Sequence, residues 1–211
     1  MCSILVLVSG NGTNLQALID AERRGDLGLG RIAAVIADRP CRAVERAGAA
    51  GIAAGLEEPD PRLPREDRRR DLSDRLLRIC RERRIDLVIL AGFLSILAGE
   101  FLRVYAERII NLHPSLLPRF GGPGMYGERV HREVLAAGET RSGCTVHLVD
   151  AGTDTGPVLL RRQVAVLPGD TPGTLAGRIH REEHIAIVEA AAMMAERLSG
   201  ESAAQGGKGF L

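Results

Sequence analysis

The chain has 211 residues, of which 45% are hydrophobic and 26% are charged, a composition that is typical of globular proteins and excludes a disordered one. The net charge of +1 and the 3% share of aromatic residues argue against nucleic acid and an anionic membrane surface as partners. Lys208 is the only lysine, which excludes a P-loop and a lysine Schiff base, so any phosphate must be held by backbone N–H groups, hydroxyls, amides or arginine.

Alternating strands and helices are predicted for the first half of the chain. Continuous apolar runs predict strands buried on both faces, at residues 3–8, 32–37, 85–91 and 108–112. Apolar stripes at helical spacing lie between them, at residues 15–24, in a segment ending near residue 50, and in an arginine-rich segment over 65–84. This alternation indicates crossover units and a parallel sheet.

The second half of the chain has a different pattern. Residues 144–149 and 158–166 alternate like half-exposed strands and predict an antiparallel pair. Thr171 is the expected N-cap of a last long helix, and residues 199–211 are expected to form a disordered tail. We therefore expect one α/β domain over residues 1–198, with a Rossmann-like, mainly parallel sheet, helices on both faces and an antiparallel C-terminal strand pair.

Neither a targeting segment nor a membrane span is predicted. The apolar run at residues 4–8 is too short for a signal peptide, and no apolar stretch approaches the roughly 20 residues that span a bilayer. The four cysteines show no Cys-x-x-Cys spacing, so we expect no metal or redox site of that type. These features lead us to expect a cytoplasmic protein with reduced thiols.

A Gly-rich loop, Ser9-Gly10-Asn11-Gly12-Thr13-Asn14, lies between the first strand and the first helix. Glycine allows close backbone approach, and a helix N-terminus offers unpaired N–H groups, so a phosphate is the expected ligand. Asp38 ends the second strand, where a dinucleotide-binding protein has its ribose-binding acid, but Leu15 replaces the third glycine of that motif. A dinucleotide and a purely structural loop remain as alternatives.

Three polar residues farther along the chain are candidates for acid–base chemistry. Asn111 and His113 alternate at the end of a predicted strand, just before Pro114, where open α/β sheets place their ligands. Asp154 precedes Gly-Pro and is able to orient or charge an imidazole, although such a residue is often only a turn former. The segment His180–His184 also matches an inverted zinc-protease pattern, but that pattern is short and needs a further ligand.

Taken together, these segments resemble the folate-dependent formyltransferases. The resemblance runs from about residue 3 to 198, and it is most specific at SGNGTNLQAL, NLHPSLLP, SGCTVH, DTGP and EEH. It implies transfer of a formyl group from 10-formyltetrahydrofolate, as a cosubstrate, to the amine of glycinamide ribonucleotide in purine biosynthesis. The implied partners are small molecules, with no metal, nucleic acid or membrane, and the enzyme is expected to be a monomer or homodimer.

The resemblance also assigns site residues. The catalytic set is Asn111, His113 and Asp154, and the ribonucleotide is expected at Gly12, Thr13, Asn14 and Glu183. The folate is expected at Arg65, Leu94, Ser95, Ile96, Leu97, Asn111, Val149, Asp150 and Asp154. His113, as an imidazolium whose pKa is raised by Asp154, and the amide of Asn111 are expected to stabilise the developing oxyanion. The proton route, through His113 or through a water held by Asp154, stays open.

Several departures and alternatives remain. Residues 94–96 read Leu-Ser-Ile where the family often has Met-Arg-Ile, and the segment Phe120–Tyr126 is longer than the usual Pro-Gly turn. Methionyl-tRNA formyltransferase is expected to carry an additional RNA-facing domain, and formyltetrahydrofolate deformylase a regulatory one. A deformylase, a formyltransferase with a different amine acceptor, a zinc hydrolase using His180 and His184, and a non-enzymatic phosphate-binding module are the competing hypotheses.

Overall fold

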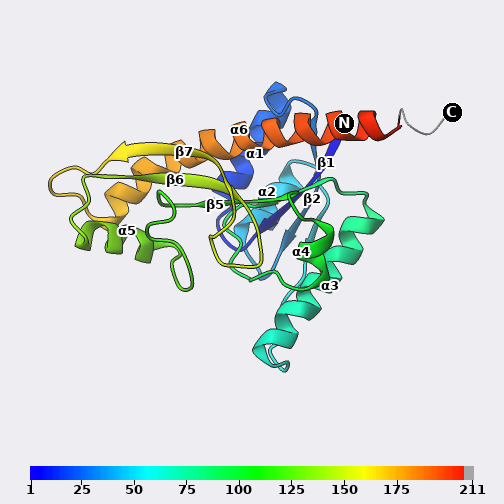
Figure 1. Cartoon of the computed structure of the whole chain (residues 1–211), viewed down its shortest axis with the longest axis horizontal. Coiled ribbons are helices and arrows are strands. Elements are labelled where there is room, and N and C mark those ends of the chain that lie inside the picture. Colours follow the sequence, from blue (N-terminus) through cyan, green and yellow to red (C-terminus); the bar gives the residue numbers. More distant parts are fainter. Residues whose placement is uncertain (207–211) are drawn as a thin grey trace.

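The computed structural model describes the backbone of residues 1–206 and the side chains of residues 1–201. Its seven strands form one sheet in the order β3-β2-β1-β4-β5-β6-β7 (Figure 1). The first five strands are parallel, and they are β1 (Cys2–Val8), β2 (Gly30–Ala37), β3 (Ala54–Leu56), β4 (Leu87–Leu90) and β5 (Ile109–His113). The last two, β6 (Arg141–Leu148) and β7 (Val158–Ala165), are antiparallel to their neighbours.

Strand β1 lies at the centre of the sheet and contributes to two hydrophobic cores. Ile4, Val6 and Val8 point into one core, and Leu5 and Leu7 into the other. All five side chains are fully buried, which explains why this strand reads as a continuous apolar run rather than an alternating one.

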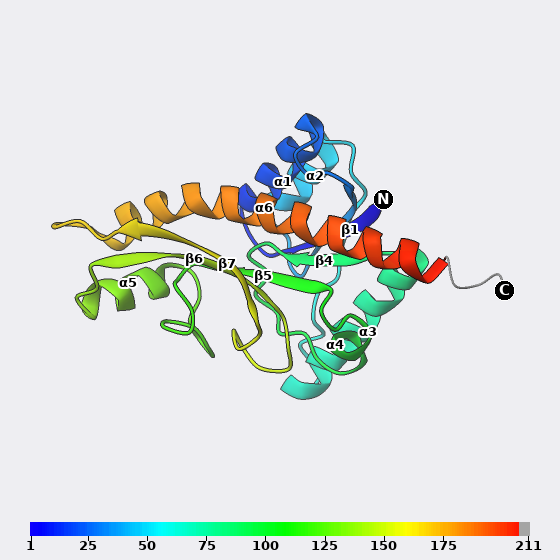
Figure 2. The same cartoon turned by 45° about the horizontal axis from the view of Figure 1, so that its top comes forward.

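Helices cover both faces of the sheet (Figures 1 and 2). Helices α1 (Thr13–Arg24), α2 (Arg42–Ala49) and α6 (Pro172–Gly206) pack over one core, and α5 (Glu128–Ala136) contributes Val134 to it. Helices α3 (Arg65–Glu82) and α4 (Glu100–Val104) pack over the other core. In both views α6 runs across the sheet from the β6–β7 hairpin to the N-terminal strands, so this one helix covers both halves.

Most of the predicted elements are confirmed, and two short ones were missed. The predicted strands and long helices are all present, and the Thr171 hydroxyl accepts a hydrogen bond from the Thr174 N–H (3.2 Å), as an N-cap does. Strand β3 and helix α4 have only three and five residues, too few to show a periodic pattern. Helix α6 extends to Gly206, past residue 199 where we expected the tail to begin, and residues 207–211 lie outside the described part.

The strand order places a crevice at the carboxyl ends of β1 and β4. The chain moves from β1 outward to β3, then returns to β4 on the other side of β1, so the connections after β1 and β4 diverge. Such a switch point is where open α/β sheets bind ligands. The Ser9 hydroxyl spans this point, because it accepts a hydrogen bond from the Leu94 N–H (2.8 Å). Among the described residues, no helix has the length and apolar character needed to cross a membrane.

Candidate active site

A cavity of about 1090 Å³ lies at the carboxyl ends of β1, β4 and β5. It brings together nearly all of the predicted site residues: Asn14, Arg65, Leu94, Ser95, Ile96, Leu97, Asn111, His113, Val149, Asp150, Asp154 and Glu183. Two predicted residues, Gly12 and Thr13, do not line the cavity, although Gly10 and Asn14 on either side of them do. The sequence predictions therefore converge on one site.

The Gly-rich loop enters helix α1 through Gly12, which has a left-handed conformation (φ 70°). A Cβ at this position would lie 2.7 Å from the Cβ of Ala43, so close packing of α2 also requires glycine. No side chain within residues 1–201 caps α1, and its first turn contains no acidic residue. The N–H groups of this turn are therefore available to an anion. Arg46 is not available, because it donates to the Asn11 carbonyl (2.7 Å) and to Gln16.

Asn14 and Glu183 lie at the same end of the cavity, on helices α1 and α6. The Asn14 amide donates to a Glu183 carboxylate oxygen (3.4 Å), and His180 Nε2 lies 3.8 Å from the same oxygen. Glu183 is only 4% exposed, and burial raises the pKa of its carboxyl, an effect that His180 and Asn14 partly offset. A buried carboxyl with one long hydrogen bond is suited to receive donors from a ligand.

The catalytic candidates meet at the junction of the parallel and antiparallel parts of the sheet. In the β5–β6 pairing, Asn111 lies directly opposite His147. The Asn111 amide nitrogen is 3.1 Å from His147 Nε2 and 3.5 Å from Asp154 Oδ1. Asp154 reaches this position from the β6–β7 connection, with a left-handed backbone (φ 58°) that Asp tolerates better than most residues.

Hydrogen-bond partners determine which nitrogen carries the proton in each histidine. His113 Nε2 lies 2.8 Å from the Phe120 carbonyl oxygen, which is only an acceptor, so Nε2 carries a hydrogen. His113 Nδ1 faces Asp154 Oδ2 at 3.4 Å. By the same argument, His147 donates from Nδ1 to the Leu148 carbonyl (2.8 Å), which leaves its Nε2 to accept from Asn111. Of these two rings, only His113 therefore has a nitrogen, Nδ1, that is free to exchange a proton.

The net shift of the His113 pKa is opposite to the direction expected from its charged neighbour alone. Burial lowers the pKa of His113, and neither the Asp154 carboxylate nor the hydrogen bond to Phe120 reverses that direction. Burial alone would raise the pKa of Asp154, but His147, His113 and the Gly122 N–H together hold that pKa below its usual value. Asp154 thus raises the His113 pKa as expected, but desolvation outweighs it, and the net shift favours a neutral imidazole beside a carboxylate.

The opposite wall of the cavity is formed by residues 93–97. Leu94 and Ile96 are 44% and 39% exposed, which is high for apolar side chains and suits contact with a flat ring. The Ser95 hydroxyl donates to buried Asp38 (2.6 Å), which also pairs with Arg39. Asp38 thus supports this wall from behind, and it does not line the cavity.

The loop after Phe120 is joined to the catalytic acid. The Gly122 N–H donates to Asp154 Oδ2 (2.9 Å), the same oxygen that faces His113. A Cβ on Gly121 would collide with the Leu117 side chain and lie 3.2 Å from the Cβ of Asp154. Residues 122–127 then line the cavity, so the segment that exceeds the usual turn length forms part of its wall.

Sequence reasoning missed two histidines of this cavity. His147 lies in the quoted SGCTVH motif, but its role depends on the β5–β6 register, which the sequence does not give. His131, on α5, is 2% exposed, and among the described residues its buried Nδ1 has no hydrogen-bond partner. Burial lowers the pKa of His131 to about 4. Val130 and Val134 are one helical turn apart, and His131 lies between them on the buried face of α5, so the spacing of the two valines could have indicated its burial.

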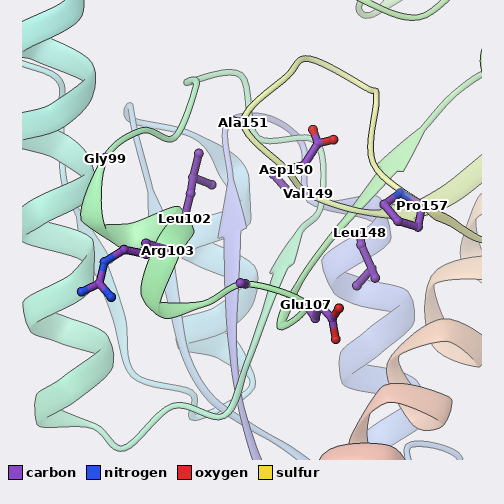
Figure 3. A pocket seen from close by; sticks show the side chains of 10 residues that line it. Gly99, Leu102, Arg103, Glu107, Leu148, Val149, Asp150, Ala151 and Pro157 are labelled. Carbon is purple, nitrogen blue, oxygen red and sulfur yellow. The ribbon is translucent and has the colours of Figure 1, made fainter.

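A second, smaller hollow of about 490 Å³ lies between α4 and the β6–β7 connection (Figure 3). It shares Val149 and Asp150 with the main cavity. Its charged residues do not form a reactive group, since Arg103 pairs with Glu100 outside the hollow. Within residues 1–201, no group of three His, Cys, Asp or Glu side chains is arranged to hold a metal ion, at His180 and His184 or elsewhere. The acid–base groups thus belong to the larger cavity.

Comparison with known proteins agrees with this geometry. Residues 2–191 match the formyl transferase family model. The chain is 43% identical over 196 residues to a trifunctional purine biosynthetic protein of Drosophila pseudoobscura pseudoobscura, covering 91% of this chain but only 14% of that protein's length. It is 41% identical over 192 residues to the phosphoribosylglycinamide formyltransferase of Mycobacterium tuberculosis, covering 91% of this chain and 84% of that protein.

A solved structure extends the comparison to three dimensions. The crystal structure of glycinamide ribonucleotide transformylase 1 from Symbiobacterium toebii superposes with a TM-score of 0.84 at 41% identity, covering 93% of this chain and 88% of that one. The family match spans the whole sheet and every predicted site residue. On sequence, fold and site together, the chain belongs to the formyl transferase family.

Proposed function

We propose that this chain transfers a formyl group from 10-formyltetrahydrofolate to the amine of glycinamide ribonucleotide. The proposal rests on one observation: Asp154 lies 3.5 Å from the Asn111 amide nitrogen and 3.4 Å from His113 Nδ1. These three residues line one cavity together with Asn14, near the N-terminus of α1, and Glu183. The same reaction is named for the relatives that match most of this chain. A phosphate-binding module would not need the buried acid–base group.

The two substrates are assigned to opposite walls. The phosphate of the ribonucleotide is placed at the first turn of α1, near Gly12, Thr13 and Asn14, and its glycinamide arm is placed against Glu183. The folate is placed against residues 94–97 and the stretch from Val149 to Asp154, with the formyl group toward His113. This arrangement brings the amine and the formyl carbon together, which is a large part of the acceleration that a two-substrate enzyme provides.

Proton transfer is assigned to His113 Nδ1. The amine attacks the formyl carbon, forms a C–N bond and becomes positively charged, so it must lose a proton before the C–N bond to the folate breaks. A neutral His113 accepts that proton at Nδ1, since Nε2 is already donating to Phe120. Asp154, 3.4 Å away, stabilises the imidazolium that forms, and the proton then passes to the departing folate nitrogen.

Negative charge on the formyl oxygen requires donors that are already in place. The Asn111 amide has two hydrogens, of which one points to His147 Nε2 and the other, at 3.5 Å, to Asp154 Oδ1. The second contact is long, so an oxyanion is able to compete for that hydrogen. His113 becomes a second donor from Nδ1 once it has accepted the amine proton, so of the two donors only Asn111 is in place before the attack.

The proposal assigns the chain two small-molecule substrates and no metal or nucleic acid, in the cytoplasm, where its four free cysteines stay reduced. A single chain supplies every group that the scheme uses, so a monomer suffices and a homodimer is equally compatible with it.

The test is an assay of purified protein with 10-formyltetrahydrofolate, with and without glycinamide ribonucleotide and with and without a chelator. We expect formyl transfer that depends on the ribonucleotide and does not change with chelator. Formate release without an acceptor would instead identify a deformylase. Transfer to other amines only would identify a formyltransferase with a different acceptor.

A further inference from the structure

We propose that Asp38 is a positioning residue for the folate cosubstrate, because its carboxylate fixes the folate wall (residues 93–97) from behind in the shape to which the folate binds. This inference rests on the proposed function, which places the folate against that wall, and it adds a residue to the site. Asp38 directly follows β2 and does not line the cavity. It therefore acts on the ligand only through the residues that it holds.

The folate wall depends on side chains for its position. It lies between β4 and α4 and belongs to neither, and in the described part of the chain its five residues form no backbone–backbone hydrogen bond. Its hydrogen bonds run to the ends of two other strands instead. The Leu94 N–H donates to the Ser9 hydroxyl (2.8 Å), and the Ser95 hydroxyl donates to the Asp38 carboxylate (2.6 Å). These two contacts tie the wall to the sheet.

Asp38 is a strong acceptor because it is both buried and charged. Its side chain is fully buried, and Arg39 donates to both of its oxygens, at 3.0 and 3.1 Å. Burial alone would raise the pKa of Asp38, but hydrogen bonds from Arg39, Ser95 and Ser9 hold that pKa below its usual value. Hydrogen bonds to a charged group are roughly twice as strong as neutral ones, so the Ser95 contact is a firm attachment.

The attachment point is itself rigid. Strand β1 lies between β2 and β4, so Asp38 and the wall meet across the central strand. The Asp38 N–H donates to the Val8 carbonyl (3.3 Å), which fixes Asp38 to the end of β1. Ser9 follows Val8 and bonds to both Asp38 and Leu94. A change at Asp38 therefore reaches the wall directly through Ser95 and also through Ser9.

The direction of the Ser95 side chain determines what the ligand meets. Its hydroxyl is turned toward Asp38, whereas its neighbours Leu94 and Ile96 are 44% and 39% exposed and line the cavity. Loss of the Asp38 acceptor releases Ser95, and the orientation of the two apolar side chains is released with it. Binding sites need such support, since a side chain that contacts a ligand is held in place by the residues behind it.

The test measures the affinities of 10-formyltetrahydrofolate and glycinamide ribonucleotide separately, by calorimetry. Asp38→Ala and Ser95→Ala should each weaken folate binding about tenfold, because a hydrogen bond to a charged group is lost. Ribonucleotide affinity should stay within about twofold of wild type. The double variant should bind folate as Asp38→Ala does, and not about a hundredfold more weakly than wild type, because the two residues act through one contact. Ser95→Thr keeps the hydroxyl and should bind folate as wild type does.

Asp170→Ala is the matched control. Asp170 has the same kinds of partner as Asp38, since Arg178 donates to both of its oxygens (2.8 and 2.9 Å) and the Thr174 hydroxyl donates to one of them (2.9 Å). Its side chain is 5% exposed, and it does not line the main cavity. This variant should lose stability in urea unfolding and keep the wild-type affinity for folate.

Several outcomes would overturn the inference and leave the proposed function intact. They are an unchanged folate affinity in Asp38→Ala or Ser95→Ala, an equal loss in Asp170→Ala, an equal loss for both ligands, and independent effects in the double variant. If Asp38→Ala does not fold, Ser95→Ala and Ser95→Thr decide the matter, since equal folate affinities in these two variants would also overturn the inference. No binding of folate to wild type would overturn the proposed function as well.

Discussion

Replacing Asp154 with asparagine tests whether this residue works by its charge. The variant keeps the shape of the side chain, and its amide oxygen is still able to accept from the Gly122 N–H. The substitution therefore removes the negative charge and preserves the loop contact.

The magnitude follows from the distance and the burial. At 3.4 Å, a carboxylate and an imidazolium attract each other by about 5 kcal/mol at an effective dielectric of ~20 and by about 1 kcal/mol in bulk water. The side chains of His113 and Asp154 are 5% and 11% exposed, which is nearer the first limit. An intermediate loss of about 3–4 kcal/mol in the transition state corresponds to a fall of about 10²–10³ in kcat.

The dependence of activity on pH distinguishes an electrostatic role of Asp154 from a structural one, because only the electrostatic role predicts that the profile shifts in Asp154→Asn. Activity requires neutral His113, so in wild type it falls as the pH decreases through the pKa of this residue. In Asp154→Asn the nearby negative charge is lost, so the pKa of His113 falls further and the acid limb moves to lower pH. We expect KM values to change less than kcat, since the ion pair forms mainly in the transition state.

The measurements are steady-state kinetics from pH 5 to 9 and an NMR titration of His113 in both proteins. Asp74→Asn, an exposed position on α3, makes the same charge change away from the site and should behave as wild type. An unchanged His113 pKa together with a large loss of activity would refute the electrostatic argument. Asp154 would then act by another route, such as holding a water, since the contact with the Gly122 loop is preserved in the variant.

Three further changes test other parts of the site. Asn14→Ala should weaken ribonucleotide binding about tenfold or more, because the end of the cavity where the ribonucleotide is placed loses a hydrogen-bond donor. Folate binding should not change, and calorimetry with each ligand measures both affinities. Glu183→Gln should raise KM for the ribonucleotide about 10- to 100-fold. In wild type we expect KM to rise at acidic pH, as this carboxyl with a raised pKa protonates, and we expect no such rise in the variant. A rise in the variant equal to that of wild type would show that another group titrates. His131 has a folded pKa of about 4, below its unfolded value of about 6.5. The free energy of unfolding should therefore be fully retained above pH 6.5 and fall progressively toward pH 4. In urea unfolding, His131→Gln should reduce this dependence on pH, and an unchanged dependence would mean that other groups cause it.

The sequence predicts the fold where periodic patterns are long. Strand β1 and helix α3 follow from runs of seven and eighteen residues, whereas β3, with three residues, shows no pattern. Most of the predicted site residues, all but Gly12 and Thr13, line one cavity, and those at the ends of β1, β4 and β5 do so because parallel strands end at a common edge. His147 could not be placed in this way, since its position opposite Asn111 depends on an antiparallel register.

Charge states were the least predictable property. The motifs bring His113 and Asp154 together, and on charge alone the pKa of the histidine should rise. Burial reverses that direction, and burial depends on how the Phe120 loop and β6 cover the imidazole. A sequence gives the sign of a neighbour's charge but not the amount of water around it.

The length and position of α6 have a consequence for how the protein is made. This helix follows every strand of the sheet in the chain, and its residues Leu175, Ile179 and Ile187 are fully buried over the sheet. On the ribosome, where chains emerge from the N-terminus, the part of this face that α1 and α2 do not cover stays exposed until α6 has been synthesised. Because Glu183 lies on α6, the core and the substrate site are completed at the same time. A chain interrupted before α6 therefore exposes apolar surface that is prone to aggregation, and it lacks the Glu183 side of the substrate site. Such truncated chains should depend on chaperones and be degraded rapidly.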